Sequence, residues 1–309
     1  MKKWIAGIIV VAVMFFFITY FSIASTLTIS NTVYCEVTFP GASRCIMNKA
    51  FWPKWWPDTA ASQNKYDYKG DAYRLTDTHI SSAVITIGNN NDPIVSEMRV
   101  LELVYDSVAI NWTLNIKTSL NPFKRISQYQ QAVRLKANTL AILNHLKVFA
   151  ENDKNIYGIP IELSSIEHIF ILTTKSVYDH YPTTTEIYEK INFLKEFGNK
   201  QHLVQTYYPM MNVIKTNDTS YRLMVGLPVN KETFYRGDIH SVRMVQGNFM
   251  VTEVKGGYKT ISNALDQIQL YFQDYEKTAM AIPFEYIVTN RLSEQDTTKW
   301  ITKIYAPVN

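Results

Sequence analysis

Two stretches of the chain repeat one order of predicted elements, and this repeat constrains the fold more than any other feature. Patterns of strand, amphipathic helix, strand and strand occur at 239–254, 258–277, 283–290 and 298–307. The same order occurs earlier, at 161–174, 185–198, 207–215 and 221–229. Both copies end in Pro-Val-Asn, at 228–230 and 307–309. A period of about 75–80 residues indicates a pair of supersecondary units. We therefore expect two βαββ halves that face each other across a groove.

The groove between the halves is the candidate ligand site, because small molecules bind preferentially in concave places where structural units meet. One carboxylate stands in the apolar strand expected at 283–290. Side chains alternate between the faces of a strand, so Glu285 shares a face with Ile287 and Thr289. If that face lines the groove, Glu285 is a charge in a low-dielectric place and needs a cationic partner. The alternative is that Glu285 lies on a solvated face.

The second half resembles a known family. The sequence pattern lies in VQGNFMVTEVKGGY at 245–258, PFEY at 283–286 and WITKIYAPV at 300–308. These segments are similar to the GyrI-like domain, the effector-binding module of some AraC-type and MerR-type transcription regulators. The resemblance covers about residues 157–309 and depends on pattern and order. It implies that this part binds a small molecule and that Glu285 faces the ligand.

The repeat supplies companions for Glu285. Aligning Pro228 with Pro307 places Tyr221 at the position of Trp300, and aligning Pro209 with Pro283 places Met211 at the position of Glu285. Aromatic faces attract cations, and methionine adapts to irregular shapes. Such walls suit a small hydrophobic or cationic molecule. Two further candidates are aromatic residues for which simple packing is the alternative, Tyr208 and Tyr305.

Two functions follow from this site. The first is binding of the small molecule without chemistry. The second is hydrolysis of a small strained or hydrophobic substrate, which some GyrI-like proteins carry out, with Glu285 as general base and Trp300 as stacking platform. No Gly-x-Ser-x-Gly or similar nucleophile motif supports the enzyme, so we favour binding. A second polar group within hydrogen-bond reach of Glu285 would favour hydrolysis, and a solitary carboxylate among aromatic rings would favour binding.

The N-terminus has the composition of a membrane anchor. Lys2 and Lys3 precede residues 5–24, which carry no charge and are long enough to span a bilayer as a helix. This predicts a single-pass membrane protein with a cytoplasmic N-terminus and an extracytoplasmic body, periplasmic in a Gram-negative cell. A cleaved signal peptide is the alternative, because Ser22-Ile23-Ala24 resembles a cleavage site.

The region between the anchor and the repeat predicts a separate domain. A strand at 27–38, a short helix within 41–56, strands at 66–76, 81–88, 94–103 and 107–116, and a helix at 127–150 follow in order. This order resembles the SRPBCC or START-like helix-grip fold, whose relatives enclose an apolar cavity. Three tryptophans after the short helix would line the cavity mouth, lie at the bilayer surface or pack in the core: Trp52, Trp55 and Trp56. The prediction is an α+β chain with an anchor at 1–26, this domain at 27–155 and the GyrI-like domain at 156–309, joined by a polar linker at 151–158.

Other classes of site have little support. Cys35 and Cys45 either form a disulfide or remain two free thiols. The six histidines show no metal-ligand spacing, so we expect no metal and no cofactor. A net charge of +4 is too small and too dispersed to propose nucleic acid as a partner. The sequence does not indicate which protein partner, if any, the chain binds.

Overall fold

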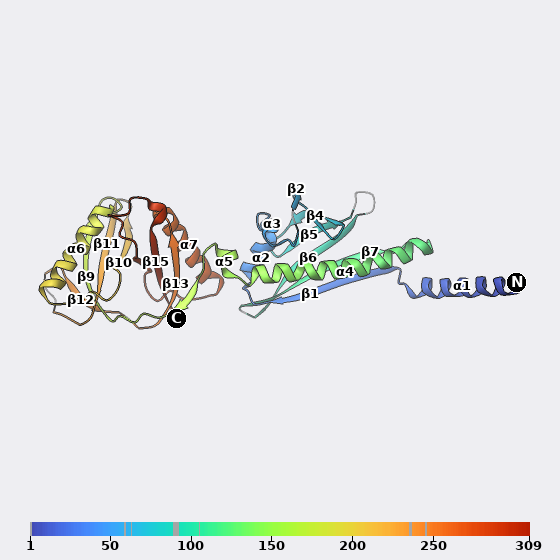
Figure 1. Ribbon diagram of the computed structural model, residues 1–309, viewed down its shortest axis with the longest axis horizontal. Helices are drawn as coiled ribbons and strands as arrows, with labels where there is room; N and C mark the ends of the chain where they lie inside the picture. The colour runs from blue at the N-terminus through green and yellow to red at the C-terminus, as the bar shows by residue number, and fades with distance from the viewer. Residues whose placement is uncertain are drawn as a thin grey trace. The chain divides into compact units, whose positions relative to one another are not determined.

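The computed structural model describes the whole chain except residues 1, 59, 63, 89–92, 105, 235–236 and 245 (Figure 1). The chain divides into two compact units, Met1–Asn152 and Asp153–Asn309. Both units combine helices with an antiparallel sheet. This agrees with the predicted α+β class.

Unit 1 has one antiparallel sheet with the strand order β1-β7-β6-β5-β4-β3-β2. Its elements in chain order are α1 (Lys2–Ser22), β1 (Thr26–Cys35), α2 (Phe39–Met47), α3 (Trp52–Trp55), β2 (Ala60–Ser62), β3 (Lys65–Tyr68), β4 (Asp71–Thr78), β5 (Ser82–Ile87), β6 (Ile94–Val104), β7 (Ser107–Lys117) and α4 (Pro122–Ala150). The single strand predicted at 66–76 is a hairpin, because Lys69 and Gly70 adopt φ of 47° and 81° and reverse the chain. The helix predicted at 127–150 begins earlier, where Asn121 caps it.

The long helix α4 packs along β1 and β7 (Figure 1). Buried Asn31 of β1 holds it there, since its Nδ2 donates to the Thr139 hydroxyl at 2.8 Å. The three tryptophans are core residues, with exposed fractions of 5% or less. Each indole N–H donates to a backbone carbonyl, at Ile46, Cys45 and Asp67 for Trp52, Trp55 and Trp56 in turn. These side chains therefore pack in the core. The START-like assignment of unit 1 stays a prediction.

The cysteines of unit 1 do not form the disulfide that was one of the two alternatives. Cys35 and Cys45 are free thiols, and both are buried. Burial raises the pKa of each thiol to about 12. Both groups therefore stay protonated at neutral pH and behave as small apolar side chains.

The predicted anchor region is helical as α1, and many of its described apolar side chains are exposed, including Ile8, Val11 and Phe21. Within the part of the chain that the structure describes, no helix combines the length and the apolar character needed to cross a membrane. The transmembrane anchor predicted for residues 5–24 is therefore not supported by the structure.

Unit 2 has one sheet of eight strands, in the order β12-β9-β11-β10-β14-β15-β13-β8. Its elements are α5 (Asp153–Tyr157), β8 (Glu162–Ser164), β9 (Phe170–Tyr178), α6 (Thr184–Lys200), β10 (Met210–Asn217), β11 (Ser220–Val229), β12 (His240–Arg243), β13 (Asn248–Lys255), α7 (Tyr258–Asp274), β14 (Phe284–Ile287), the 3-10 turn η1 (Thr297–Lys299) and β15 (Ile301–Val308). The predicted linker at 151–158 includes the short helix α5, whose Tyr157 hydroxyl donates to Asp274 at 2.7 Å.

The two βαββ halves, β9-α6-β10-β11 and β13-α7-β14-β15, have the predicted order, but they share one sheet instead of facing each other as two. β10 and β14 pair at the junction, where Met210 opposes Tyr286 and Met211 opposes Glu285. The strands predicted at 161–174 and 239–254 are each two strands. β8 pairs with β13 of the second half, and β12 pairs with β9 of the first. The chain crosses between the halves after β8 and after β12, so neither strand can run on unbroken.

Helices α6 and α7 of unit 2 cover one face of the sheet, which we call the helix face. α6 packs against β9 and β11, and α7 packs against β13 and β15 (Figure 1). Residues of β10 and β14 alternate, so Met211 and Ile287 join the core beneath α6, whereas Met210 and Phe284 point to the other face. We call that second face the open face. A separate apolar cluster lies on it, which includes Phe249, Tyr286 and Tyr305.

Candidate functional site

Glu285 lies on the helix face of β14, directly opposite Met211 of β10. It is 6% exposed, so it does not lie on a solvated face. Its strand neighbours Phe284 and Tyr286 point to the open face and Ile287 joins the core under α6. The sequence pattern that puts one carboxylate into an apolar strand therefore produces a nearly buried charge.

A cation from the same chain lies beside this carboxylate. Nη2 of Arg291 is 3.4 Å from Oε2 of Glu285, and the two side chains are 1% and 8% exposed. The same Nη2 donates to the Thr302 hydroxyl at 2.9 Å. The backbone N–H of Arg291 donates to the Tyr188 hydroxyl of α6 at 2.7 Å. Arg291 belongs to the connection between β14 and β15, and these contacts hold that connection against the helix face.

Aromatic rings flank the guanidinium. Cζ of Arg291 is 5.0 Å from the ring centroid of Trp300 and 5.6 Å from that of Tyr258, both within the range of cation–π attraction. The Trp300 indole is fixed by its N–H, which donates to the Glu294 carbonyl at 2.8 Å. We call the side chains around the guanidinium the cation cage: Glu285, Thr302, Trp300 and Tyr258.

The rings of the cage continue into the first half of the repeat. The Tyr258 centroid is 5.6 Å from that of Trp300 and 5.4 Å from that of Tyr181, and Tyr181 is 5.9 Å from Tyr221. Trp300 and Tyr221, which the repeat places at equivalent positions, therefore stand at the two ends of a row of four rings. Tyr181 is 43% exposed, so the row reaches the surface of unit 2.

The electrostatics of the cage are unbalanced. Burial raises the pKa of Glu285 above its ordinary value, and the Arg291 charge and hydrogen bond lower it in part. Among the residues that the structure describes, Nε and Nη1 of Arg291 have no hydrogen-bond partner although they are buried. A buried polar group without a partner costs about 1–3 kcal/mol, and a charged one costs more. The cage therefore holds a cation whose hydrogen-bonding capacity it satisfies only in part.

The structure brings together some of the predicted site residues and separates others. Glu285 and Trp300 lie in the cage, Met211 opposes Glu285 and Tyr221 ends the aromatic row. Tyr305 lies in the cluster on the open face and Tyr208 is 40% exposed, with its ring against Tyr207 at 5.0 Å. Sequence reasoning missed Arg291, Tyr258, Tyr181 and Thr302. Strand alternation could have indicated Thr302, because it lies two residues from Ile304 and therefore on the same face of the strand. No local sequence signal indicates Arg291.

A second polar group does lie within hydrogen-bond reach of Glu285, which was the expected sign of hydrolysis. That group is a guanidinium, which offers hydrogen-bond donors and no acceptor. It neither activates a water nor attacks a substrate. The pairing instead occupies the carboxylate that would serve as general base, and the geometry favours binding.

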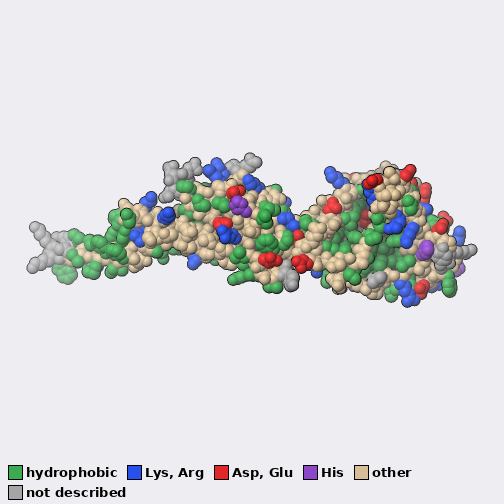
Figure 2. Space-filling model, turned by 180° about the vertical axis from the view of Figure 1, so that it is seen from behind, with side chains coloured by type: hydrophobic (Ala, Val, Ile, Leu, Met, Phe, Trp, Pro, Cys, Tyr) green, Lys and Arg blue, Asp and Glu red, His purple; other side chains and the backbone are tan. Residues whose placement is uncertain are grey.

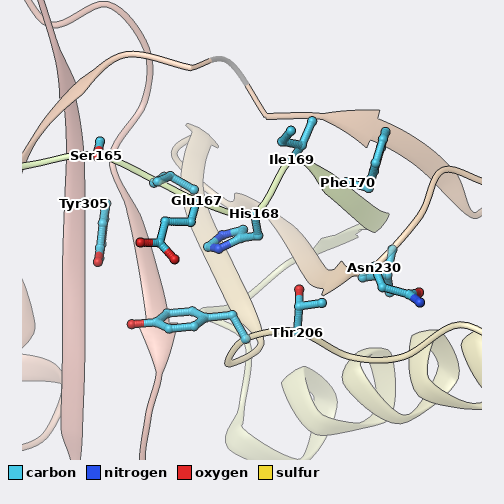
Figure 3. A pocket seen from close by; sticks show the side chains of 11 residues that line it. Ser165, Glu167, His168, Ile169, Phe170, Thr206, Asn230 and Tyr305 are labelled. Atoms are coloured by element: carbon cyan, nitrogen blue, oxygen red, sulfur yellow. The ribbon is translucent and has the colours of Figure 1, made fainter.

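A cavity of about 620 Å³ lies near Tyr305, beside the segment that joins β8 and β9 (Figure 3). Glu167 and His168 point into it from the segment between β8 and β9 (Figure 3). The His168 ring stacks on Tyr207 at 5.2 Å and its Nε2 is hydrogen-bonded to the Tyr286 hydroxyl. Burial lowers the pKa of His168, which favours the neutral imidazole. This cavity is separate from the cation cage, because none of the cage residues lines it.

The solved structures named below each resemble about half of this chain. No protein-family model and no curated protein matches the chain. The chain is similar to the solved EcmrR C-terminal domain, with 17% identity, a TM-score of 0.43 and coverage of 49% of this chain and 98% of that one. It is also similar to SAV2435 bound to tetraphenylphosphonium, with 16% identity, a TM-score of 0.35 and coverage of 49% and 94%. A hydrolase from Listeria innocua has 7% identity, a TM-score of 0.38 and coverage of 48% and 91%.

At identities below 20% and TM-scores below 0.5, these similarities assign neither a family nor a function to this chain. The function is therefore argued from the cage itself.

Proposed function

We propose that unit 2 binds a small organic cation with apolar or aromatic substituents in the cation cage, and that the ligand takes the place that the Arg291 guanidinium occupies in the free protein. The observation that carries this proposal is the position of Arg291, next to the nearly buried Glu285 and over the rings of Trp300 and Tyr258. A site that accommodates a guanidinium has the charge and the ring faces that an organic cation requires.

The contacts of Arg291 make replacement feasible. Its single contact with Glu285 is longer than a strong charge-assisted hydrogen bond, which measures about 2.7–2.9 Å. Its Nε and Nη1 lack partners among the described residues. A cation whose charge is shielded by apolar groups needs no such partners, so it meets the same carboxylate and rings without leaving donors unpaired.

The connection that carries Arg291 has few apolar anchors beside the contacts of Arg291 itself. Asn290 and Leu292 on either side of Arg291 are exposed. Few buried apolar contacts would therefore be lost if this segment swung outward. Such a movement breaks the hydrogen bonds that Arg291 donates to Tyr188, Glu285 and Thr302.

Tetraphenylphosphonium and tetraphenylborate test this proposal, because they have nearly the same shape and opposite charge. We expect titration calorimetry on the full chain to give a Kd for the phosphonium at least about tenfold lower than for the borate, equivalent to about 1.4 kcal/mol. Equal affinity, or tighter binding of the borate, would show that Glu285 does not select the charge of the ligand.

We further propose, on the sequence of residues 5–24, that the protein is attached to a membrane and that unit 2 faces away from the cytoplasm. In that place the cage would meet molecules outside the cytoplasm. This part of the proposal is independent of the cage and has its own test below.

A further inference from the structure

A second and larger cavity lies on the open face of the unit 2 sheet, away from the cation cage. Its volume is about 820 Å³. Figure 2 shows hydrophobic side chains around a hollow on the C-terminal unit, at the right, with basic side chains among them. Its floor is built from residues of β9, β10, β11 and β14 whose neighbours in the strand face the helices. The sheet therefore separates this cavity from Glu285.

The cavity is basic at one end. Lys175 of β9 stands directly opposite Met224 of β11, and Arg222 lies two residues before Met224 on the same face. Both basic residues are exposed and line the cavity. None of the lining residues in the described part of the chain has an acidic side chain. Arg243 also lines the cavity, but its charge is balanced by Glu232 at 2.6 Å. Lys175 and Arg222 therefore give this end a positive potential.

The opposite end is apolar. Met210, Phe284 and Phe249 form a buried floor there, beside Gly226. A Cβ on Gly226 would come within 2.7 Å of Met210 Cγ and 2.9 Å of Ile171 Cγ2, so glycine allows these side chains to close over the strand. Met280 and Ile282 form an exposed apolar rim, at 62% and 54% exposure. Methionine side chains adapt to ligands of different shape.

The spacing of the two ends defines the shape of a ligand. Arg222 and Gly226 are four residues apart on β11, which corresponds to about 13 Å along a strand. A molecule that meets both ends needs an anionic group at one end and an apolar chain of about that length. Hydrocarbon placed on the floor would be stabilised because its apolar surface is removed from water.

We propose that the open-face cavity binds a single-chain amphipathic anion, such as a fatty acid. Its carboxylate lies between Lys175 and Arg222, and its hydrocarbon chain lies along Met210 and Phe284. The basic end complements the charge of the carboxylate, and the apolar floor behind it suits the hydrocarbon chain. These two features favour this occupant. The proposal is independent of the cation cage, which lies on the other face of the sheet and selects the opposite charge.

Dodecanoate and dodecanol test the proposal, because they share the chain and differ in charge. On the full chain at low ionic strength, we expect dodecanoate to bind at least about tenfold more tightly than dodecanol. The difference shrinks as salt is added, because the basic residues are exposed. Equal binding of the two ligands would overturn the proposal.

Three variants locate the charge selectivity. Lys175→Gln and Arg222→Gln are each expected to weaken dodecanoate about two- to fivefold, the range of exposed ion pairs, and to leave dodecanol unchanged. Lys195→Gln is the matched control, because Lys195 is exposed on α6 on the helix face. An equal effect of the control would overturn the proposal, since it would indicate a general effect of net charge.

Two further measurements separate the alternatives. Ile282→Asp on the exposed rim should weaken both ligands, because it places a polar group beside the hydrocarbon chain. Glu285→Gln should leave dodecanoate binding unchanged, so failure of the cation cage and failure of this cavity are distinguishable. A dimer in sedimentation that Ile282→Asp dissociates would assign the open face to a second copy of the chain and contradict the proposal.

Discussion

Nη2 of Arg291 lies 3.4 Å from Oε2 of Glu285, and the two side chains are almost completely hidden from solvent. The residues are six positions apart, one in the central strand β14 and the other in the connection that follows it. The chain thus places its own cation against its own buried carboxylate. Removing one partner of a buried pair costs about 3–5 kcal/mol, because the other charge is left alone. An external cation can therefore pair with the Glu285 carboxylate only when the Arg291 guanidinium has moved out of the cage.

Glu285→Gln keeps the shape of the side chain and removes its charge. We expect the affinity for tetraphenylphosphonium to fall by about 1.5–3 kcal/mol, the scale of a hydrogen bond to a charged group. The affinity for triphenylphosphine oxide, a neutral molecule with similar rings, should stay the same. Calorimetry with both ligands measures the two changes. Unchanged binding of the phosphonium would remove the carboxylate from the site.

Trp300→Ala should weaken both of these ligands, because it removes ring area from the cage whatever the charge of the ligand. Aromatic contacts contribute about 0.5–1.5 kcal/mol beyond area burial, so we expect a loss of at least that size. Tyr34→Ala, at a 65% exposed aromatic residue in unit 1, is the control. If Trp300→Ala weakened the phosphonium alone, Trp300 would act through charge and would not provide a general stacking surface.

The stability of the protein should depend on pH through Glu285. Burial raises the pKa of Glu285 above its ordinary value of 4.5, and unfolding restores the ordinary value. Just above pH 4.5 the folded state therefore binds more protons at this site than the unfolded state. The contribution of Glu285 to the free energy of unfolding falls as the pH rises through this window.

Glu285→Gln has no such proton and is the reference for this measurement. We expect the Tm of the parent minus the Tm of the variant to decrease as the pH is raised from about 4.5 toward neutrality. Thermal unfolding of both proteins at a series of pH values measures this difference. A difference that increases with pH would mean that the Arg291 charge outweighs burial.

Much of unit 2 could be predicted because the signals are local or repeated. The Pro-Val-Asn repeat relates Tyr221 to Trp300, the alignment of Pro209 with Pro283 relates Met211 to Glu285, and strand alternation groups Glu285 with Ile287. The crossings after β8 and β12 could not be predicted, because pairing with a distant strand decides where each strand ends. The same reasoning placed two halves across a groove, whereas β10 and β14 join them edge to edge.

The central contact of the site escaped prediction for a different reason. Arg291 lies in a polar connection, where an arginine is normally solvated. Its burial depends on Tyr188 of α6, on Thr302 of β15 and on Trp300 just before β15. Tyr305 was grouped with the site although it alternates with Ile304, and alternation puts it on the open face. Contacts between residues that are distant in the sequence decide the partner of a buried charge. The local patterns of a single sequence do not reveal those contacts.

Cell location is tested separately. Residues 5–24 predict attachment to a membrane, whereas no helix in the described part of the chain is long and apolar enough to cross one. We expect the chain in the membrane fraction and an active alkaline phosphatase when that enzyme is fused after Asn309. An inactive fusion would reverse the orientation, and release into the soluble fraction would show that the segment is cleaved or is not an anchor.

The account depends most on the claim that Arg291 occupies the place of the ligand, and Arg291→Ala tests it. We expect this variant to bind tetraphenylphosphonium at least about tenfold more tightly than the parent, because the ligand no longer displaces a cation and meets an unpaired carboxylate. Lys299→Ala is the matched control, since Lys299 belongs to the same connection and its side chain is 59% exposed.

The unpaired carboxylate destabilises Arg291→Ala, so the double variant Arg291→Ala with Glu285→Gln is measured beside it. The double variant retains the space and loses both charges, and we expect it to lose the gain in affinity. Calorimetric Kd values for the parent and the three variants are the direct measurement. The account predicts a gain for Arg291→Ala alone; an unchanged or weaker affinity in a folded Arg291→Ala protein would contradict it.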